Sequence, residues 1–388
     1  MPPGAAANAA RSGRKCRQER PQQNVWNALL ECRENAILEH VVNWMERILI
    51  TGANGFIGSN LCRYFLDHSY EVAALVRRSS DLHFLEGVPV ELTYADLAVP
   101  GHVDLPSGID YVIHAASLVV ESMTMDEARR GIHETTVNLL RLLEENGVRP
   151  KRFVYISTAL VLGHRSTNIA EDRRGAPARG LMPYVRAKEM TEATLLERFR
   201  TTGLPVVILR PSDVYGPYDR TSSLRLLGGI EDGWPVIAGS GRHVLSFCFV
   251  GNLARACALA CRMRGRDGAA YTVTNGQDVT WRRLMGYFQD RLGKKQRLFV
   301  PMAAAYAIAL CMQLLHAVFP AFVMRVSFYP VSKVGRDTSY DIARTRDELG
   351  YEPDQDLETQ LEAVVQWYLA EKGSGGLTRT GRRRKKWS

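Results

Sequence analysis

The residues with the clearest potential for chemistry are a tyrosine and a lysine four positions apart, Tyr184 and Lys188. Residues four apart lie on one face of a helix, so a helix over 184–202 would hold the phenol beside the ammonium. A neighbouring ammonium favours the phenolate, and we expect Lys188 to lower the pKa of Tyr184 from its usual value of about 10. A tyrosine adjusted in this way can exchange a proton with an alcohol oxygen.

Two hydroxyl side chains, Ser157 and Thr158, stand at the end of a strand predicted over 152–157. A hydroxyl in this place can orient a substrate oxygen and stabilise charge that forms on it. The tyrosine–lysine spacing is common on helices that do no chemistry, and these hydroxyls are what favour a catalytic role. We therefore predict a catalytic set of Tyr184, Lys188, Thr158 and Ser157.

The elements that would position this set begin with an apolar strand over 47–51, which runs directly into glycines spaced G-x-x-G-x-x-G. Helical periodicity follows over 57–68. Such a strand–turn–helix unit binds a dinucleotide pyrophosphate, because glycine lets the backbone approach the phosphates and the start of the helix favours negative charge. The predicted contacts are Gly52, Asn54, Gly55, Phe56, Ile57 and Gly58.

Further strands and helices alternate along the chain. Strands are predicted over 71–76, 89–93, 110–114, 152–157 and 205–210, and helices over 57–68, 126–146 and 184–202. This alternation predicts an α/β fold, a Rossmann-type doubly wound parallel sheet with a smaller C-terminal α/β substrate-binding region. We place the cofactor-binding core mainly over 45–215 and the substrate-binding part mainly over 216–368, within a domain over 45–371.

The two ends of the chain differ from this domain in charge. Of the net +9, residues 1–20 supply +4 and residues 372–388 supply +7, which leaves the body at about −2 (9 − 11). We expect 372–388 to be a disordered basic tail, with contact to anionic lipid or nucleic acid as the alternative, and no specific nucleic-acid binding. Since Met45 directly precedes the first strand, we interpret 1–44 as an extension that is disordered or not native.

The cysteines indicate a reducing compartment. There are seven, an odd number, and none forms a C-x-x-C pair, which fits the cytoplasm better than a disulfide framework. Cys257 and Cys261 lie four apart, but no histidine stands beside them at metal-ligand spacing. We predict that both are core residues and that the chain has no metal site.

The choice of cofactor should be visible where the second strand ends. Val76 stands about where an acidic residue would bind the ribose of NAD, and Arg77 and Arg78 follow it. Two guanidinium groups suit the 2′-phosphate of NADP, with a solvated basic turn as the alternative. NADP is therefore favoured and NAD stays open. Asp96 and Leu97, after the third strand, are candidates for contact with the adenine.

Taken together, these motifs resemble the extended short-chain dehydrogenase/reductase family over residues 47 to about 368. The matching segments are 51–58, 114–116, 155–158, Tyr184 with Lys188, and 210–217. The resemblance implies that Tyr184 is the general acid/base, that Lys188 modulates its pKa and binds the ribose, and that Thr158 rather than Ser157 orients the substrate.

The resemblance also implies cofactor contacts from Ala115 and Ala116 and from Pro211, Ser212 and Val214, the last three beside the nicotinamide. A homodimer formed through a pair of helices is usual in the family. One position departs from the family pattern: Ile132 stands where an asparagine is usual. A proton-relay or structural role of that asparagine is therefore in doubt here.

Two features bear on the substrate. Leu245 stands where members resembling sugar-nucleotide enzymes carry a diphosphate-binding arginine, although Arg242 could compensate, and residues 250–252 resemble the 3β-hydroxysteroid dehydrogenase branch. Residues 302–319 carry no formal charge. They could form a core or substrate-lid helix, a helix that contacts a membrane peripherally, or a membrane span; the same branch has a membrane-associating segment in a similar place.

Three hypotheses of function follow. The first is an NAD(P)-dependent oxidoreductase that acts on a secondary alcohol or ketone of an apolar, steroid- or isoprenoid-like small molecule. The second is a nucleotide-sugar epimerase or dehydratase, and the third is a dinucleotide-binding protein without turnover. We expect a cytoplasmic protein, with membrane association through 302–319 left open.

Overall fold

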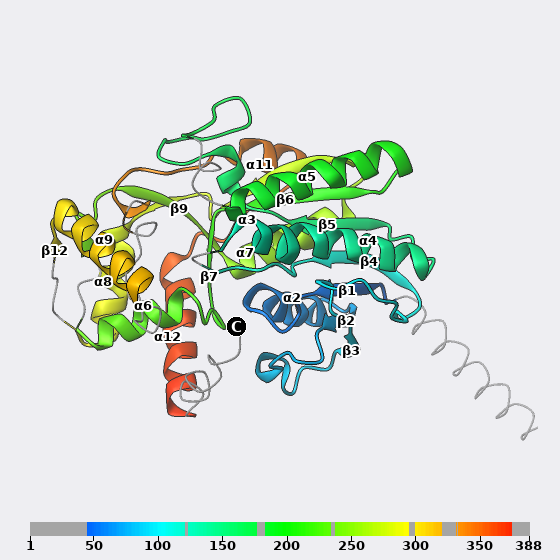
Figure 1. Cartoon of the computed structure of the whole chain (residues 1–388), viewed down its shortest axis with the longest axis horizontal. Coiled ribbons are helices and arrows are strands. Elements are labelled where there is room, and N and C mark those ends of the chain that lie inside the picture. The colour runs from blue at the N-terminus through cyan, green and yellow to red at the C-terminus, as the bar shows by residue number, and fades with distance from the viewer. Residues whose placement is uncertain are drawn as a thin grey trace, which may run out of the picture. The chain divides into compact units, whose positions relative to one another are not determined.

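The structure is a computed structural model, shown in Figure 1. It describes residues 45–120, 123–176, 183–233, 237–294, 299–319, 331 and 333–374. The predicted extension over 1–44 and nearly all of the predicted basic tail lie outside the described residues, so these two predictions stay predictions.

Seven strands of the described chain form one parallel sheet in the order β10-β6-β5-β4-β1-β2-β3. Along β1, Ile48 and Ile50 pack into the apolar cluster on one face and Leu49 packs into the cluster on the other. A strand buried on both faces requires this pattern, because successive side chains point to opposite sides. The strands are β1 (Arg47–Thr51), β2 (Glu71–Val76), β3 (Glu91–Tyr94), β4 (Ile109–His114), β5 (Arg152–Ile156), β6 (Val206–Pro211) and β10 (Ala269–Val273).

Helices cover both faces of this sheet (Figure 1). On the Ile48 face lie α2 (Phe56–Asp67), α7 (Val250–Arg262) and α11 (Ala343–Leu349), and on the Leu49 face lie α4 (Thr135–Glu145) and α5 (Pro183–Thr202). Cys257 and Cys261 on α7 are buried among the apolar residues of the Ile48 face, as predicted. The predicted doubly wound parallel sheet is thus confirmed.

The predicted helix over 126–146 is divided into three parts. It comprises α3 (Met125–Ala128), a π-helical segment η2 (Arg129–Glu134) and α4. Close packing accompanies the irregular turn, because a Cβ added to Gly131 would lie 2.6 Å from the Cβ of Leu118. π-Helical turns are rare and are often found at functional sites.

The C-terminal part adds a second, smaller group of elements. Helices α6 (Ser223–Glu231), α8 (Trp281–Arg291) and α12 (Leu357–Gly373) pack around one apolar cluster. A sheet in the order β11-β9-β7 is built from β11 (Asp278–Thr280), β9 (Val244–Phe249) and β7 (Asp213–Tyr215). The short strands β8 (Ile237–Ala238) and β12 (Phe299–Val300) pair, and α9 (Met302–Val318) follows them. None of the helices described is long and apolar enough to cross a membrane.

A buried set of hydrogen bonds joins these elements to the end of β6. The hydroxyl of Tyr215 on β7 donates to Gln360 Oε1 on α12 at 2.5 Å. Asn275 donates from Nδ2 to the same two oxygens at 3.0 Å, and Asn252 on α7 donates to Asn275 Oδ1 at 2.9 Å. Since buried polar groups need partners, this set fixes β7, which carries Val214, one of the residues predicted to border the nicotinamide.

Candidate active site

The glycine turn after β1 lies in close backbone contact with the end of β4. Gly52 has φ +65°, and a Cβ there would lie 2.8 Å from the Cα of Ala116. A Cβ on Gly58 would lie 2.7 Å from the Cα of Ala53. Only glycine fits both positions, because a side chain would meet backbone that cannot move away cheaply. The turn therefore brings Gly52 and Ala116, predicted separately from the sequence, side by side.

A buried histidine holds this contact in place. His114 at the end of β4 pairs through Nδ1 with Thr51 Oγ1 at 2.7 Å and through Nε2 with Thr136 Oγ1 at 2.9 Å. Thr51 Oγ1 also accepts from the Ala116 amide at 3.1 Å. Burial, followed by the charge of Lys188, lowers the pKa of His114 to about 3, so the imidazole stays neutral. A neutral ring can donate on one nitrogen and accept on the other, as these two hydroxyls require.

The surroundings of the turn fit a dinucleotide. Helix α2 begins after Gly55 with no side chain capping its first amides and no acidic residue in its first turn. Within the described chain, the buried hydroxyls of Ser117 and Ser212 have no hydrogen-bond partner. Free amides at a helix start and unpaired hydroxyls can bind phosphate and ribose oxygens. The chain residues that would hold the group are the predicted ones: Gly52, Asn54, Gly55, Phe56, Ile57, Gly58, Ala115, Ala116, Pro211, Ser212 and Val214.

The predicted catalytic residues come together at the end of β5 and the start of α5. Lys188 Nζ lies 5.7 Å from the centre of the Tyr184 ring and donates to the carbonyl oxygen of Ile156 at 2.7 Å. Thr158 lies two residues after the end of β5, and its hydroxyl acts on Tyr184 as a hydrogen-bond partner that lowers the pKa of the phenol. Its Oγ1 also accepts from the Leu160 amide at 3.3 Å, at the start of the 3₁₀ turn η3 (Ala159–Leu162).

The prediction that Lys188 lowers the pKa of Tyr184 is wrong when the groups of this chain alone are considered. Burial raises the pKa of Tyr184 above its usual value, and the negative charge of Asp213 raises it further, against the opposing hydrogen bond from Thr158. Burial also lowers the pKa of Lys188 to about 7, with the charge of Glu192 acting in the other direction. Burial of both groups therefore outweighs the simple attraction between phenolate and ammonium.

Ser157 and Thr158, predicted together, have different partners. The hydroxyl of Ser157 donates to Glu192 Oε1 at 2.5 Å, inside the protein. Glu192 in turn accepts from Arg210 Nε at 3.0 Å, and Arg210 also forms an ion pair with Glu171. The Ser157 hydroxyl is thus hydrogen-bonded to a buried carboxylate, whereas the Thr158 hydroxyl contacts the phenol of Tyr184.

The ends of β2 and β3 hold the residues predicted to select the cofactor. Arg77 and Arg78 are exposed after β2, and the Arg78 guanidinium lies 5.2 Å from the centre of the Tyr94 ring at the end of β3. Asp96 is also exposed, but its carboxylate accepts from the Ala98 amide at 3.0 Å in a local turn. Leu97 is buried in the apolar cluster on the Leu49 face. The two arginines are thus exposed positive charges at the end of β2.

The structure adds an unpredicted charge near Tyr184 and shows the surroundings of Ile132, which the sequence had singled out. Asp213 at the start of β7 pairs with Lys333 in the C-terminal part and adds negative charge near Tyr184. The sequence contained Asp213 within a matching segment, but nothing local could connect it to Lys333. Ile132, in place of the usual asparagine, lies in η2 and packs in an apolar cluster with Ala187 and Tyr184. The hydrocarbon side chain of Ile132 has no exchangeable proton and cannot take part in a proton relay.

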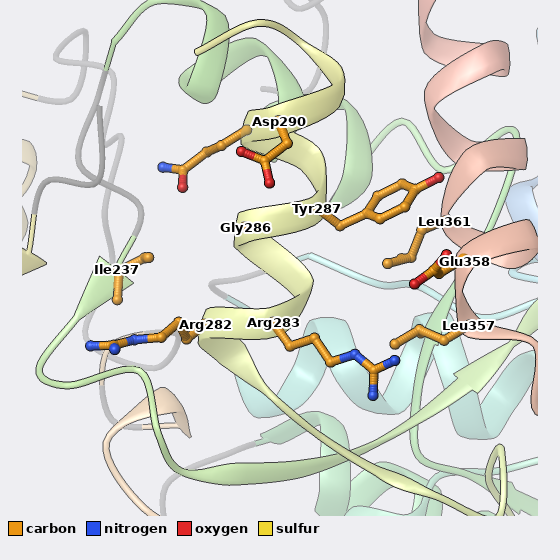
Figure 2. Close-up of a pocket in the computed structure, with 10 residues that line it drawn as sticks. Ile237, Arg282, Arg283, Gly286, Tyr287, Asp290, Leu357, Glu358 and Leu361 are labelled. Atoms are coloured by element: carbon orange, nitrogen blue, oxygen red, sulfur yellow. The ribbon is translucent and has the colours of Figure 1, made fainter. Parts of the chain in front are cut away.

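A separate cavity of about 300 Å³ lies in the C-terminal part. Figure 2 shows its lining side chains, which project from α8, α12 and β8 and include Arg282, Arg283, Asp290 and Glu358. None of the residues of the predicted site lines it. The chemistry predicted from the sequence thus belongs to the ends of the parallel strands rather than to this cavity.

A parallel sheet with a glycine turn at its first crossover, together with a half-buried tyrosine beside a buried lysine, is typical of the extended short-chain dehydrogenase/reductase class. The family model of the NAD dependent epimerase/dehydratase family matches residues 48–274. The chain belongs to this family, and its members are enzymes.

Relatives within the family differ in their substrates. The sterol demethylase protein B of Methylococcus capsulatus is 27% identical over 341 residues, which cover 82% of this chain and 97% of that protein. A dTDP-glucose 4,6-dehydratase of Haemophilus influenzae is 26% identical over 361 residues, covering 85% and 100%. A 3 beta-hydroxysteroid dehydrogenase/Delta 5-->4-isomerase of Mycobacterium tuberculosis is 26% identical over 342 residues, covering 84% and 90%.

A solved structure with the same fold carries a bound dinucleotide. RMD from Pseudomonas aeruginosa, complexed with NADPH, has a TM-score of 0.59 and 22% identity, covering 84% of this chain and all of that one (100%). The family and the residues around the glycine turn together support a nicotinamide dinucleotide as the cofactor of this protein.

The close contact at Gly58 leads to a first prediction. Gly58→Ala should lower the free energy of unfolding by about 1 to 3 kcal/mol, because the new methyl group overlaps backbone atoms, and it should abolish NADPH binding. Thermal denaturation and a titration of NADPH fluorescence measure the two effects. Gly229→Ala on α6 is the matched control, since a Cβ there meets nothing within 4 Å. Unchanged NADPH affinity in folded Gly58→Ala would contradict the assignment of this turn.

Proposed function

We propose that the protein is an oxidoreductase that interconverts a secondary alcohol and a ketone on an apolar, steroid- or isoprenoid-like substrate, with NADP favoured over NAD. The observation that carries the choice of substrate is the position of Leu245. This residue is buried in β9 within the apolar cluster of the C-terminal part. The side chain of a buried leucine offers no hydrogen-bond donor to a diphosphate.

The chain's own residues have distinct parts in the proposed reaction. The Tyr184 hydroxyl exchanges a proton with the substrate oxygen, and the Thr158 hydroxyl, which contacts that phenol, orients the same oxygen. Lys188 supplies positive charge close to the phenol. A bound nicotinamide supplies or accepts the hydride. The raised pKa of Tyr184 keeps the phenol protonated at neutral pH, as donation of a proton to a ketone requires.

The nucleotide-sugar hypothesis is the alternative. It is supported by relatives such as the dTDP-glucose dehydratase, and Arg242 is exposed just before β9. The sterol and hydroxysteroid relatives match the chain over similar lengths. They support an apolar substrate as strongly as the dTDP-glucose dehydratase supports a nucleotide sugar. Leu245 is the feature of the chain itself that favours the apolar substrate.

The apolar helix α9 is a second observation in favour of an apolar substrate. It is held through the buried Ala305 and Ala309, which pack against Val331. Several large apolar side chains of α9 and the next residue are exposed instead, among them Leu310 (52%), Leu314 (59%), Val318 (68%) and Phe319 (61%). Surfaces of this kind mark interaction sites. We propose that this face contacts a membrane surface, from which an apolar substrate would be taken.

The role of Tyr184 gives a prediction on turnover. Tyr184→Phe should lower kcat about 100- to 10,000-fold, because the proton donor is lost, while NADPH binding is kept. The assay follows the oxidation of NADPH by a 3-ketosteroid through nicotinamide absorbance. For dTDP-glucose and UDP-glucose, the competing candidates, it follows product formation by chromatography, because epimerisation and dehydration leave the nicotinamide unchanged overall. Tyr287→Phe on α8, whose hydroxyl pairs with Glu362 away from the site, is the control. Turnover of a nucleotide sugar and not of the steroid would overturn the proposed substrate.

The arginine pair gives a prediction on the cofactor. Replacing Arg77 and Arg78 by alanine should raise the Kd of NADPH about 10- to 100-fold, since a hydrogen bond to a charged group contributes about 1.5 to 3 kcal/mol. The Kd of NADH should change little, because it lacks the 2′-phosphate. Fluorescence titration measures both constants, and Arg264→Ala serves as the control for loss of an exposed charge. An equal loss for both dinucleotides would argue against NADP selection by this pair.

The exposed face of α9 gives a prediction on membrane contact. The wild type should sediment with phosphatidylcholine/phosphatidylserine vesicles, and Leu310→Glu/Leu314→Glu should weaken this binding at least about tenfold, because each leucine contributes about 1.5 to 3 kcal/mol on burial. Val99→Glu, which changes an equally exposed apolar residue elsewhere (60%), should bind like the wild type. Equal sedimentation of all three proteins would rule out α9 as the contact.

A further inference from the structure

A glutamate one helical turn beyond Lys188 lies at the centre of a buried polar network. Glu192 on α5 is 6% exposed, and its carboxylate accepts from Ser157 Oγ at 2.5 Å. It also accepts from Arg210 Nε at 3.0 Å and from Arg210 Nη2 at 2.5 Å. A carboxylate at this depth is tolerated because the arginine pairs with both of its oxygens. Three elements, α5, β5 and β6, therefore meet at one side chain.

The network and the predicted catalytic pair share the same stretch of backbone. Lys188 donates to the carbonyl oxygen of Ile156, and Glu192 accepts from the side chain of the next residue, Ser157. Two successive turns of α5 thus bind two consecutive residues at the end of β5. Thr158, which contacts the Tyr184 hydroxyl, comes directly after them. A shift of Glu192 would therefore move the hydroxyl that faces the phenol.

The charges around Lys188 single out Glu192 as well. On α5 the lysine has Tyr184 one turn before it and Glu192 one turn after it. From the sheet, the ring of Tyr155 lies 4.8 Å from Nζ, and His114 on β4 is kept neutral by burial. Asp213 acts on Tyr184 rather than on the lysine. Among the described groups that act on Lys188, Glu192 is the anionic one, and its charge favours the ammonium.

We propose that Glu192 is a positioning residue for the reaction, which fixes the end of β5 through Ser157 and places a carboxylate one turn of α5 from Lys188. This inference rests on the proposed roles of Tyr184 and Lys188. Ser157, in this view, serves the framework rather than the substrate, and Arg210 holds the carboxylate in place by pairing with both of its oxygens.

The charge of Lys188 can be measured without any substrate. The protein is labelled with ¹³Cε-lysine, Lys188→Arg identifies the resonance of Lys188, and its titration is followed by NMR. In Glu192→Gln the lysine should lose its proton at least about one pH unit lower than in the wild type, because an opposite charge has been removed. Glu197→Gln, an exposed change on the same helix, should leave the titration unchanged. An unchanged titration in folded Glu192→Gln would overturn the proposal.

Turnover gives the second readout. Where a substrate is turned over, the alkaline limb of the kcat profile of Glu192→Gln should move to lower pH, whereas a purely structural defect would lower kcat equally at all pH values and so contradict the proposal. If the glutamine variant does not fold, Glu192→Asp replaces it, because aspartate keeps the negative charge. Lys188 should then lose its proton at the same pH as in the wild type, and loss at a lower pH would overturn the proposal. If the wild type turns over none of the substrates but Glu192→Gln still lowers the pH at which Lys188 loses its proton, the result would count against the proposed substrate instead.

Discussion

The burial of a lysine ammonium against the end of β5 is the constraint on which the site depends. Transfer of a charged amine into the interior is unfavourable, and the pKa of Lys188 accordingly falls to about 7. The carbonyl oxygen of Ile156 and the charge of Glu192 offset part of this penalty. Both are available only while α5 lies against the ends of β5 and β6, so the packing of the helix and the charge of the lysine depend on each other.

The glycine turn has a similar dependence on its neighbours. A turn that must approach phosphates closely cannot carry side chains of its own to hold its shape. The neutral His114 supplies that order from β4, by pairing with Thr51 just before the turn and with Thr136 on α4. Burial makes this arrangement possible, because a protonated ring could not accept from either hydroxyl.

Local features of the fold and site could be predicted from the sequence, and long-range ones could not. The alternation of apolar residues indicated six of the strands in the main sheet, but β10, a short strand late in the chain, was missed. The i,i+4 rule that pairs Tyr184 with Lys188 also pairs Lys188 with Glu192, so the proximity of Glu192 could have been predicted from the sequence. The pair of Asp213 and Lys333 was not, because only the folded chain brings them together. The predicted direction of the pKa of Tyr184 was wrong since a motif reveals neighbours but not burial.

In the proposed function, specificity and catalysis depend on different parts of the fold. The Tyr184 site is built at the ends of parallel strands that all members of such a fold require, whereas the C-terminal part can change its contacts without disturbing them. Leu245 illustrates this, because its side chain contributes to a core and not to a ligand site. The ion pair between Asp213 and Lys333 is the exception, since it joins the C-terminal part to the charge environment of Tyr184. A change in this ion pair would therefore alter the charge beside the proposed proton donor, because Asp213 takes part in both interactions.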